Sequence, residues 1–187
     1  YRELIDFTLT AFDNLTDKPA VEMHMALGGG SEVDYNGLMD FISKMKKGDR
    51  VKIFRNVPHY KIPDLYAPAI GLLIPMRDTL QDAARFPHKI GEYVASGNPM
   101  ISSNFGEVTY YFKDGENGLI ADAYDVTQFT EKMQFVLDNP EKAKAIGQRG
   151  KEMGLREFNF LHYGKRLRSF LGNLSNKQQK VGEGVGV

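Results

Sequence analysis

The chain has 187 residues and no cysteine, and its 24 Lys and Arg residues balance 24 Asp and Glu residues. Its length and its 42% of hydrophobic residues suffice for one domain with a sizeable core. Zero net charge argues against a general attraction to nucleic acid, and the lack of cysteine excludes disulfides and zinc–thiolate sites and fits a reducing compartment. No apolar run approaches the roughly 20 residues of a membrane span, and no signal peptide is visible.

The first part of the chain predicts strands that alternate with helices. Apolar residues at helical spacing predict a helix over Tyr1–Phe12, and a polar turn follows. Alternating apolar residues predict a strand over Val21–Leu27 that runs directly into Gly28-Gly29-Gly30. The next expected elements are a helix over Asp34–Lys46, a strand over Val51–Phe54, a loop with a short helix over Pro58–Tyr66, and a buried strand over Ala69–Ile74.

The second part begins with a polar, irregular stretch from Met76 to Phe86. A helix over Pro87–Ser96 then ends at Ser-Gly-Asn-Pro and leads into an apolar strand over Pro99–Ser103. The remaining expected elements are a short helix over Glu107–Phe112, a turn over Asp114–Gly118, a strand over Leu119–Ala121, helices over Asp125–Leu137, Glu141–Met153 and Phe160–Leu171, and a Gly- and Lys-rich tail over 173–187 that we expect to be disordered.

Five strands that alternate with helices indicate an α/β fold, with a Rossmann-like parallel sheet and helices on both faces. Such sheets bind ligands at the carboxyl ends of their strands. We therefore expect the functional site among the loops that follow the strands. The start of the Pro87 helix lies on that same edge.

The start of the Pro87 helix is a candidate anion site. Its first N–H groups have no partner within the helix, and Pro87 suits the first helical position because it has no N–H to leave unpaired. Lys89 adds positive charge, and Glu92, about one turn further on, can bind a pair of hydroxyls. Arg77 and Arg85 bracket the preceding loop, and arginine pairs well with diphosphate oxygens. A phosphate site next to a diol site indicates a nucleotide.

Several motifs follow one another in an order that is typical of one family. They are Leu27-Gly28-Gly29-Gly30, Asn56-Val57-Pro58, Leu72-Leu73-Ile74-Pro75, Phe86-Pro87-x-Lys89-x-x-Glu92-Tyr93-x-Ala95-x-Gly97-x-Pro99, Gly106-Glu107 and Lys113-Asp114-Gly115-Glu116-Asn117-Gly118. In this register the chain resembles the C-terminal nucleotide-sugar domain of GT-B glycosyltransferases of the family 4, group 1 type. The resemblance covers roughly residues 3 to 172.

The resemblance implies roles for individual residues. Glu92 matches the second glutamate of the family's Glu-x7-Glu motif, which binds the ribose hydroxyls, and Ala84 stands where the first glutamate would fall. The implied nucleotide-sugar site comprises Glu92, Lys89, His88, Pro87, Phe86 and Arg85 of the helix start, Arg77 of the donor loop, Asn56, Val57 and Pro58 beside the base, and Gly29 and Gly30. No catalytic residue, metal or cofactor is implied.

The chain departs from the family pattern at its start. The family's domain opens with a strand and a glycine-basic loop ahead of the Tyr1–Phe12 helix, and that strand normally lies in the middle of the sheet. This strand and the N-terminal acceptor domain are both absent from the sequence. We therefore expect residues 1–172 to be the donor-binding part of a glycosyltransferase, inactive as a fragment.

The implied reaction is the retaining transfer of a hexose from a nucleotide diphosphate sugar to a glycan or lipid-linked glycan. The expected location is the cytoplasm, with peripheral contact at the inner face of the membrane. Two alternatives stay open: a GT-B sugar-nucleotide epimerase, and a non-catalytic module that binds a nucleotide or a partner. A dinucleotide-dependent oxidoreductase fits less well, because the glycine pattern is not GxGxxG.

Overall fold

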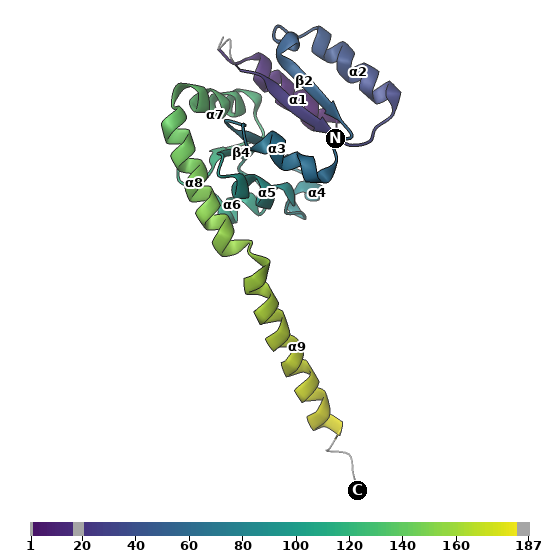
Figure 1. Ribbon diagram of the computed structural model, residues 1–187, viewed down its shortest axis with the longest axis vertical. Coiled ribbons are helices and arrows are strands. Elements are labelled where there is room, and N and C mark those ends of the chain that lie inside the picture. Colours follow the sequence, from purple (N-terminus) through teal and green to yellow (C-terminus); the bar gives the residue numbers. More distant parts are fainter. Residues whose placement is uncertain (1, 17–20, 183–187) are drawn as a thin grey trace.

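The computed structural model describes residues 2–16 and 21–182, and it describes side-chain surroundings as far as residue 174. Figure 1 shows an α/β body from which one long helix projects. The α-helices are α1 (Arg2–Asp13), α2 (Glu32–Ser43), α3 (Ile62–Tyr66), α4 (Leu80–Ala83), α5 (Lys89–Ser96), α6 (Val108–Tyr111), α7 (Val126–Asp138), α8 (Pro140–Glu157) and α9 (Phe160–Gly182). Two 3-10 turns are η1 (Gly48–Arg50) and η2 (His59–Lys61).

The strands form two parallel sheets. In the first, β1 (Met23–Leu27) pairs with β2 (Val51–Arg55). In the second, β4 (Met100–Ser103) lies between β3 (Leu72–Ile74) and β5 (Leu119–Ala121). The predicted α/β fold with parallel strands and flanking helices is confirmed, and the described strands pair in two sheets.

The division into two and three strands has a topological reason. In a doubly wound sheet of order 3-2-1-4-5-6, the first strand lies between two strands on one side and three on the other. Here β1 and β2 correspond to one side, and β3, β4 and β5 to the other. Within the described residues, β1 and β3 each pair with a neighbour on one edge only, so these two edges are the ones that a central strand would join.

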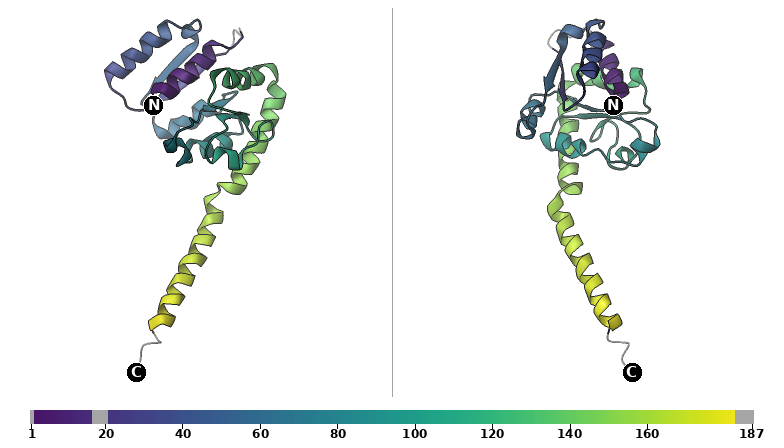
Figure 2. Two further views of the ribbon diagram at one scale, coloured as in Figure 1. Left: turned by 180° about the vertical axis from the view of Figure 1, so that it is seen from behind. Right: turned by 90° about the vertical axis from the view of Figure 1, so that its right-hand side faces the viewer.

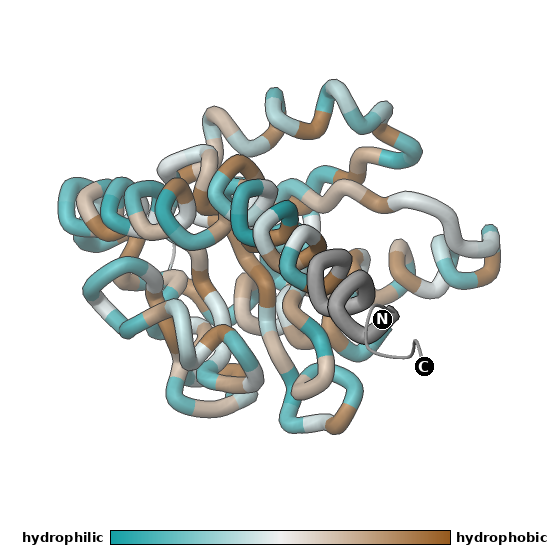
Figure 3. The backbone as a smooth tube through the Cα atoms, turned by 90° about the horizontal axis from the view of Figure 1, so that it is seen from below, coloured by the Kyte–Doolittle hydropathy of each residue, from teal (hydrophilic) through white to brown (hydrophobic). Residues whose placement is uncertain are grey.

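The described strands make no ladder between the two sheets, and side-chain packing joins them. One hydrophobic cluster includes Leu9 and Phe12 of α1, Ile101 of β4 and Phe129 of α7, all of them buried. The ring of Phe7 stacks on that of Tyr124 with 4.1 Å between centroids. Figure 3 shows hydrophobic residues, in brown, along the inner strands and hydrophilic residues, in teal, on outer turns. The α1–α7 contact therefore joins the β1–β2 unit to the rest.

A second cluster lies beneath α5 and α8 and holds α5 in place. Gly97 ends α5 in the left-handed region with a φ of 82°. A Cβ added at Gly154 would lie 2.5 Å from Cγ2 of Val94, so α8 packs directly on α5. This close approach positions the helix that carries Glu92.

Helix α9 projects away from the body in every view (Figures 1 and 2). It extends to Gly182 and thus includes residues 173–182, which the sequence predicted to be disordered; this stretch has no proline and is rich in the helix formers Lys and Gln. The last five residues of the predicted tail, 183–187, lie outside the described residues. None of the helices that the structure describes is both long and apolar enough to cross a membrane.

Candidate functional site

The carboxyl ends of β1 and β2 meet beside the glycine run. Gly29 and Gly30 adopt positive φ values of 75° and 94°, and the space beside both is open. Asn56 also has a positive φ, 51°, and its N–H donates to the carbonyl of Leu27 at 2.9 Å. Asn56 and Pro58 are exposed and Val57 is half-buried. The predicted base-side residues therefore lie on the edge where the parallel fold places ligands.

Two buried serines hold the loop after β3. The Ser102 hydroxyl donates to the carbonyl of Ile74 at 2.8 Å, and the Ser103 hydroxyl accepts the N–H of Met76 at 3.4 Å. Both serines are completely buried at the carboxyl end of β4. They fix the start of the loop that leads to α5.

A buried carboxylate organises the rest of this loop. Asp82 is completely buried, and it accepts the backbone N–H of Arg77 at 2.9 Å and the Arg77 Nε–H at 3.1 Å. The Arg85 Nε–H donates to its other oxygen at 2.8 Å. Burial alone would raise the pKa of Asp82, but the hydrogen bonds from Arg77 and the charge of Arg85 outweigh it and lower the pKa. Arg77 also pairs with Glu3 of α1 at 3.2 Å.

The two arginines predicted to flank the donor loop thus converge on Asp82. The side chain of Arg77 is 16% exposed and that of Arg85 is 33% exposed. Their charges are engaged within the loop, which makes them a scaffold for it. Phe86, another predicted site residue, packs its ring against Tyr111 and Phe158 in the second hydrophobic cluster.

Helix α5 begins two residues later than the sequence predicted. Its first residue is Lys89, and His88 occupies the N-cap position without a side-chain cap. Pro87 is buried ahead of the helix, and its carbonyl accepts the N–H of Ile90 at 3.0 Å. The prediction that Pro87 is the first helical residue is therefore wrong. The side chains of His88 and Lys89 are exposed, so no side chain caps the helix start.

The Glu92 carboxylate lies in the first turn of α5 and has two named neighbours. The Tyr66 hydroxyl, at the end of α3, donates to its Oε2 at 3.0 Å. His59 Nε2 lies 4.0 Å from its Oε1. The Glu92 side chain is 41% exposed, so a ligand can reach it. This arrangement brings the loop after β2 next to the candidate anion site.

Tyr66, His59 and Asp82 did not emerge as site residues from the sequence. A tyrosine or histidine in a loop has no spacing that marks it as a partner of a glutamate 26 or 33 positions later. Asp82 did carry a signal, because Thr79 and Asp82 match a capping-box pattern and the Thr79 hydroxyl accepts the Asp82 N–H. Among the described side chains, no three of His, Asp or Glu gather as a metal site would require.

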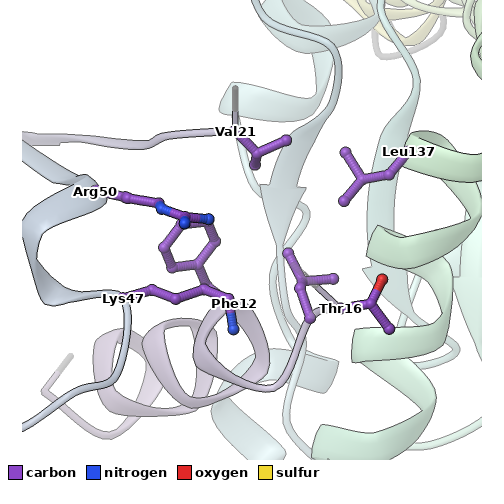
Figure 4. A pocket seen from close by; sticks show the side chains of 7 residues that line it. Phe12, Thr16, Val21, Lys47, Arg50 and Leu137 are labelled. Atoms are coloured by element: carbon purple, nitrogen blue, oxygen red, sulfur yellow. The ribbon is translucent and has the colours of Figure 1, made fainter. Parts of the chain in front are cut away.

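Figure 4 shows a small hollow elsewhere on the molecule, beside Phe12, Lys47 and Leu137. Val21 precedes β1 and Arg50 precedes β2, so this hollow lies at the amino ends of those strands. It is therefore on the edge opposite the candidate site.

The model of the family described as glycosyl transferases group 1 matches residues 2–153. The chain belongs to this family. The resemblance to group 1 glycosyltransferases is thereby confirmed. A curated relative, the GDP-mannose-dependent alpha-(1-6)-phosphatidylinositol monomannoside mannosyltransferase of Mycolicibacterium smegmatis, is 25% identical over 157 residues. That match covers 82% of the chain and 40% of the relative.

Solved structures share the fold. Sucrose-phosphate synthase from Thermosynechococcus elongatus aligns with a TM-score of 0.76 at 20% identity, over 92% of this chain and 43% of that one. HepE from Anabaena, in complex with UDP-glucose, aligns with a TM-score of 0.74 at 17% identity, over 89% of this chain and 44% of that one. The C-terminal domain of LpcC from Francisella tularensis aligns with a TM-score of 0.66 at 15% identity, over 82% of this chain and 78% of that one.

These matches establish the GT-B type of fold for this group 1 chain. The chain spans less than half the length of the mannosyltransferase and of the synthase, and most of the length of the isolated LpcC domain.

Proposed function

We propose that residues 1–172 form the donor-binding part of a retaining hexosyltransferase, which binds a nucleoside diphosphate sugar. One observation carries this proposal: the half-exposed Glu92 carboxylate lies in the first turn of α5, directly beyond an uncapped helix start that bears Lys89. Helix N–H groups attract a diphosphate, and a carboxylate accepts hydrogen bonds from a ribose diol. The relatives support the ligand class, since one is named for GDP-mannose and another was solved with UDP-glucose.

The chemistry follows from where charge develops. Transfer breaks the bond between the sugar's anomeric carbon and the diphosphate oxygen, and negative charge grows on the leaving diphosphate. The N–H groups of Ile90 and Gly91 already donate to the carbonyls of Pro87 and His88, at 3.0 and 3.2 Å. The proposed donors for that charge are therefore the N–H groups of His88 and Lys89, and the exposed Lys89 ammonium adds positive charge beside them. The acceptor hydroxyl attacks from the same face and gives its proton to the leaving diphosphate, so the configuration is retained.

The remaining parts of the proposal concern partners. The acceptor is a glycan or a lipid-linked glycan, which a domain outside this chain would hold. We propose a cytoplasmic location with peripheral contact at the inner face of the membrane, and donor binding without a metal cofactor. EDTA should leave nucleotide binding unchanged.

A second candidate function is a non-catalytic nucleotide-binding or interaction module. It is favoured by Ala84, which stands where the resemblance places a sugar-binding glutamate. The two functions differ in selectivity for the sugar. A non-catalytic module would bind UDP and UDP-hexoses alike, whereas a transferase would distinguish them.

A thermal-shift titration tests the proposal. UDP, GDP and ADP, each alone and as common hexose conjugates, are added to the purified protein. Selective stabilisation by one nucleotide, and more by one of its sugar conjugates, is the expected result. A folded protein that none of these ligands stabilises would contradict the donor site.

A further inference from the structure

We propose that Tyr66 is a positioning residue for nucleotide recognition: its hydroxyl holds Oε2 of Glu92 so that Oε1 is presented to the ribose. This inference rests on the proposed function, because it concerns the same site. The observation behind it is the hydrogen bond from Tyr66 of α3 to Glu92 of α5, two residues that are 26 positions apart in the sequence. The two bonded oxygens lie 3.0 Å apart.

The Tyr66 ring is held from two sides. It packs against the ring of Tyr93 in a T-shaped arrangement, with 5.1 Å between the ring centroids and an interplanar angle of 81°. The backbone carbonyl of Tyr66 accepts the side-chain amide of Asn98 at 2.6 Å. Asn98 directly follows Gly97, the residue that ends α5, so α3 is tied to both ends of the helix whose carboxylate Tyr66 contacts.

The phenol keeps its proton under ordinary conditions. Burial, together with the neighbouring Tyr93 and Glu92, raises the pKa of Tyr66. The hydroxyl therefore acts as a donor, and the Glu92 carboxylate as the acceptor. A charge-assisted bond of this kind restricts the rotation of a side chain that is otherwise 41% exposed.

The two oxygens of Glu92 then have different tasks. Oε2 is engaged by Tyr66, whereas His59 Nε2 lies 4.0 Å from Oε1, beyond hydrogen-bond distance. The His59 side chain is 93% exposed and can move aside. Oε1 is thus the oxygen left to accept a ribose hydroxyl.

The test uses Tyr66→Phe, which removes the hydroxyl and keeps the ring against Tyr93. Dissociation constants are measured by calorimetry for UDP and GDP, for their 2′-deoxy analogues, and for inorganic pyrophosphate. Tyr66→Phe should weaken binding of the preferred ribonucleotide about fivefold and leave pyrophosphate binding within about twofold. The preference for the ribonucleotide over its 2′-deoxy analogue should fall by a similar factor.

Three further variants complete the design. Glu92→Gln should weaken binding of the ribonucleotide at least as much as Tyr66→Phe does. The double variant Tyr66→Phe/Glu92→Gln should bind it no more weakly than Glu92→Gln alone. Tyr110→Phe removes the hydroxyl of an 82% exposed tyrosine on α6 and serves as the matched control. Because the ribose-to-deoxyribose ratio is measured within one variant, it does not depend on the fraction of protein that is folded.

The outcomes separate the two proposals. The positioning role is overturned if Glu92→Gln weakens binding of the ribonucleotide and Tyr66→Phe does not, or if Tyr66→Phe weakens binding of all ligands equally. In both cases the proposed donor site stands. If the wild-type protein shows no preference for ribose, or Glu92→Gln has no effect, the proposed ribose site itself fails.

Discussion

Arg77 donates two hydrogen bonds to the buried carboxylate of Asp82, one from its backbone N–H at 2.9 Å and one from its guanidinium at 3.1 Å. The loop between β3 and α5 is therefore built around a single charge. Arg85 closes the other side of the same carboxylate with an ion pair of 2.7 Å. The loop that leads to the candidate site is thus held by an internal ion cluster, in which both of its arginines pair with Asp82.

Removal of this charge should destabilise the loop. Asp82→Asn removes the carboxylate that Arg77 and Arg85 share. Because both arginines are partly solvated and Arg77 keeps its pair with Glu3, we expect a loss of about 2 kcal/mol in the free energy of unfolding. Urea denaturation measures it. Glu3→Gln, which removes the exposed partner of Arg77, is the control and should cost under about 0.5 kcal/mol. Equal losses in both variants would contradict the central role of Asp82.

The same carboxylate predicts a dependence of stability on pH. The pKa of Asp82 in the folded chain lies below its ordinary value of 3.8, so the unfolded chain takes up a proton at higher pH than the folded chain does. The stabilisation is complete above the unfolded pKa and is lost as pH falls through the folded pKa. Chemical denaturation between about pH 5 and pH 2 should show a steeper decline for the wild type than for Asp82→Asn. Parallel curves would contradict this assignment.

The candidate site predicts a ranking of three alanine variants. Glu92→Ala should weaken nucleotide binding about tenfold, because it removes the proposed acceptor of the ribose hydroxyls. His88→Ala should change it less than about threefold, since His88 makes no side-chain cap at the start of α5. Arg77→Ala should act mainly on stability through Asp82. Calorimetry with UDP and GDP, beside thermal unfolding, gives both readouts, and equal losses of affinity in all three variants would reject the ranking.

The contact between α5 and α8 predicts opposite effects of two similar substitutions. Gly154→Ala places a methyl group 2.5 Å from Val94 and should destabilise the protein by about 1–2 kcal/mol. Gly91→Ala, on α5 itself, meets nothing within 4 Å and should stabilise it by about 0.5–1 kcal/mol. Thermal unfolding of both variants checks the pair. A neutral Gly154→Ala would mean that the two helices pack less closely than described.

The sheet arrangement predicts a pattern of hydrogen exchange. β4 has a paired strand on each side, whereas β1 and β3 each have a described partner on one side only. Backbone amides of Ile101 and Ser102 should therefore exchange more slowly than those of Leu73 and His24, which face the unpaired edges of β3 and β1. Mass spectrometry after deuterium labelling measures the difference. Equal protection of β3 and β4 would show that the outer edge of β3 is covered.

Local patterns predicted individual elements well. Helix α7 begins and ends within one residue of its predicted range, because Asp125 caps it and its apolar residues recur at helical spacing. The turn before β5 is also as predicted, and Asn117 stabilises it by accepting the Lys113 N–H and donating to the Tyr111 carbonyl. Such features depend on residues that are close in sequence.

Features that depend on distant residues were not predictable in the same way. The division into two sheets depends on hydrogen bonds between strand edges, which periodicity does not report. The bond between Tyr66 and Glu92 depends on how α3 lies against α5. Glu92 itself was predicted from its place one turn beyond the start of the Pro87 helix and from the family motif, and neither indicates which side chain holds it.

The joint between the two sheets has a mechanical consequence. A strand ladder locks its partners at one register, whereas the apolar contacts of Phe7, Leu9 and Phe129 have no preferred direction. Directional polar links cross the same joint: the Thr130 hydroxyl donates to the Ala11 carbonyl at 3.2 Å, and Arg77 pairs with Glu3 at 3.2 Å. Gly29, Gly30 and Asn56 lie on the first unit and the start of α5 on the second, so the contact between α1 and α7 sets the distance between the two parts of the candidate site.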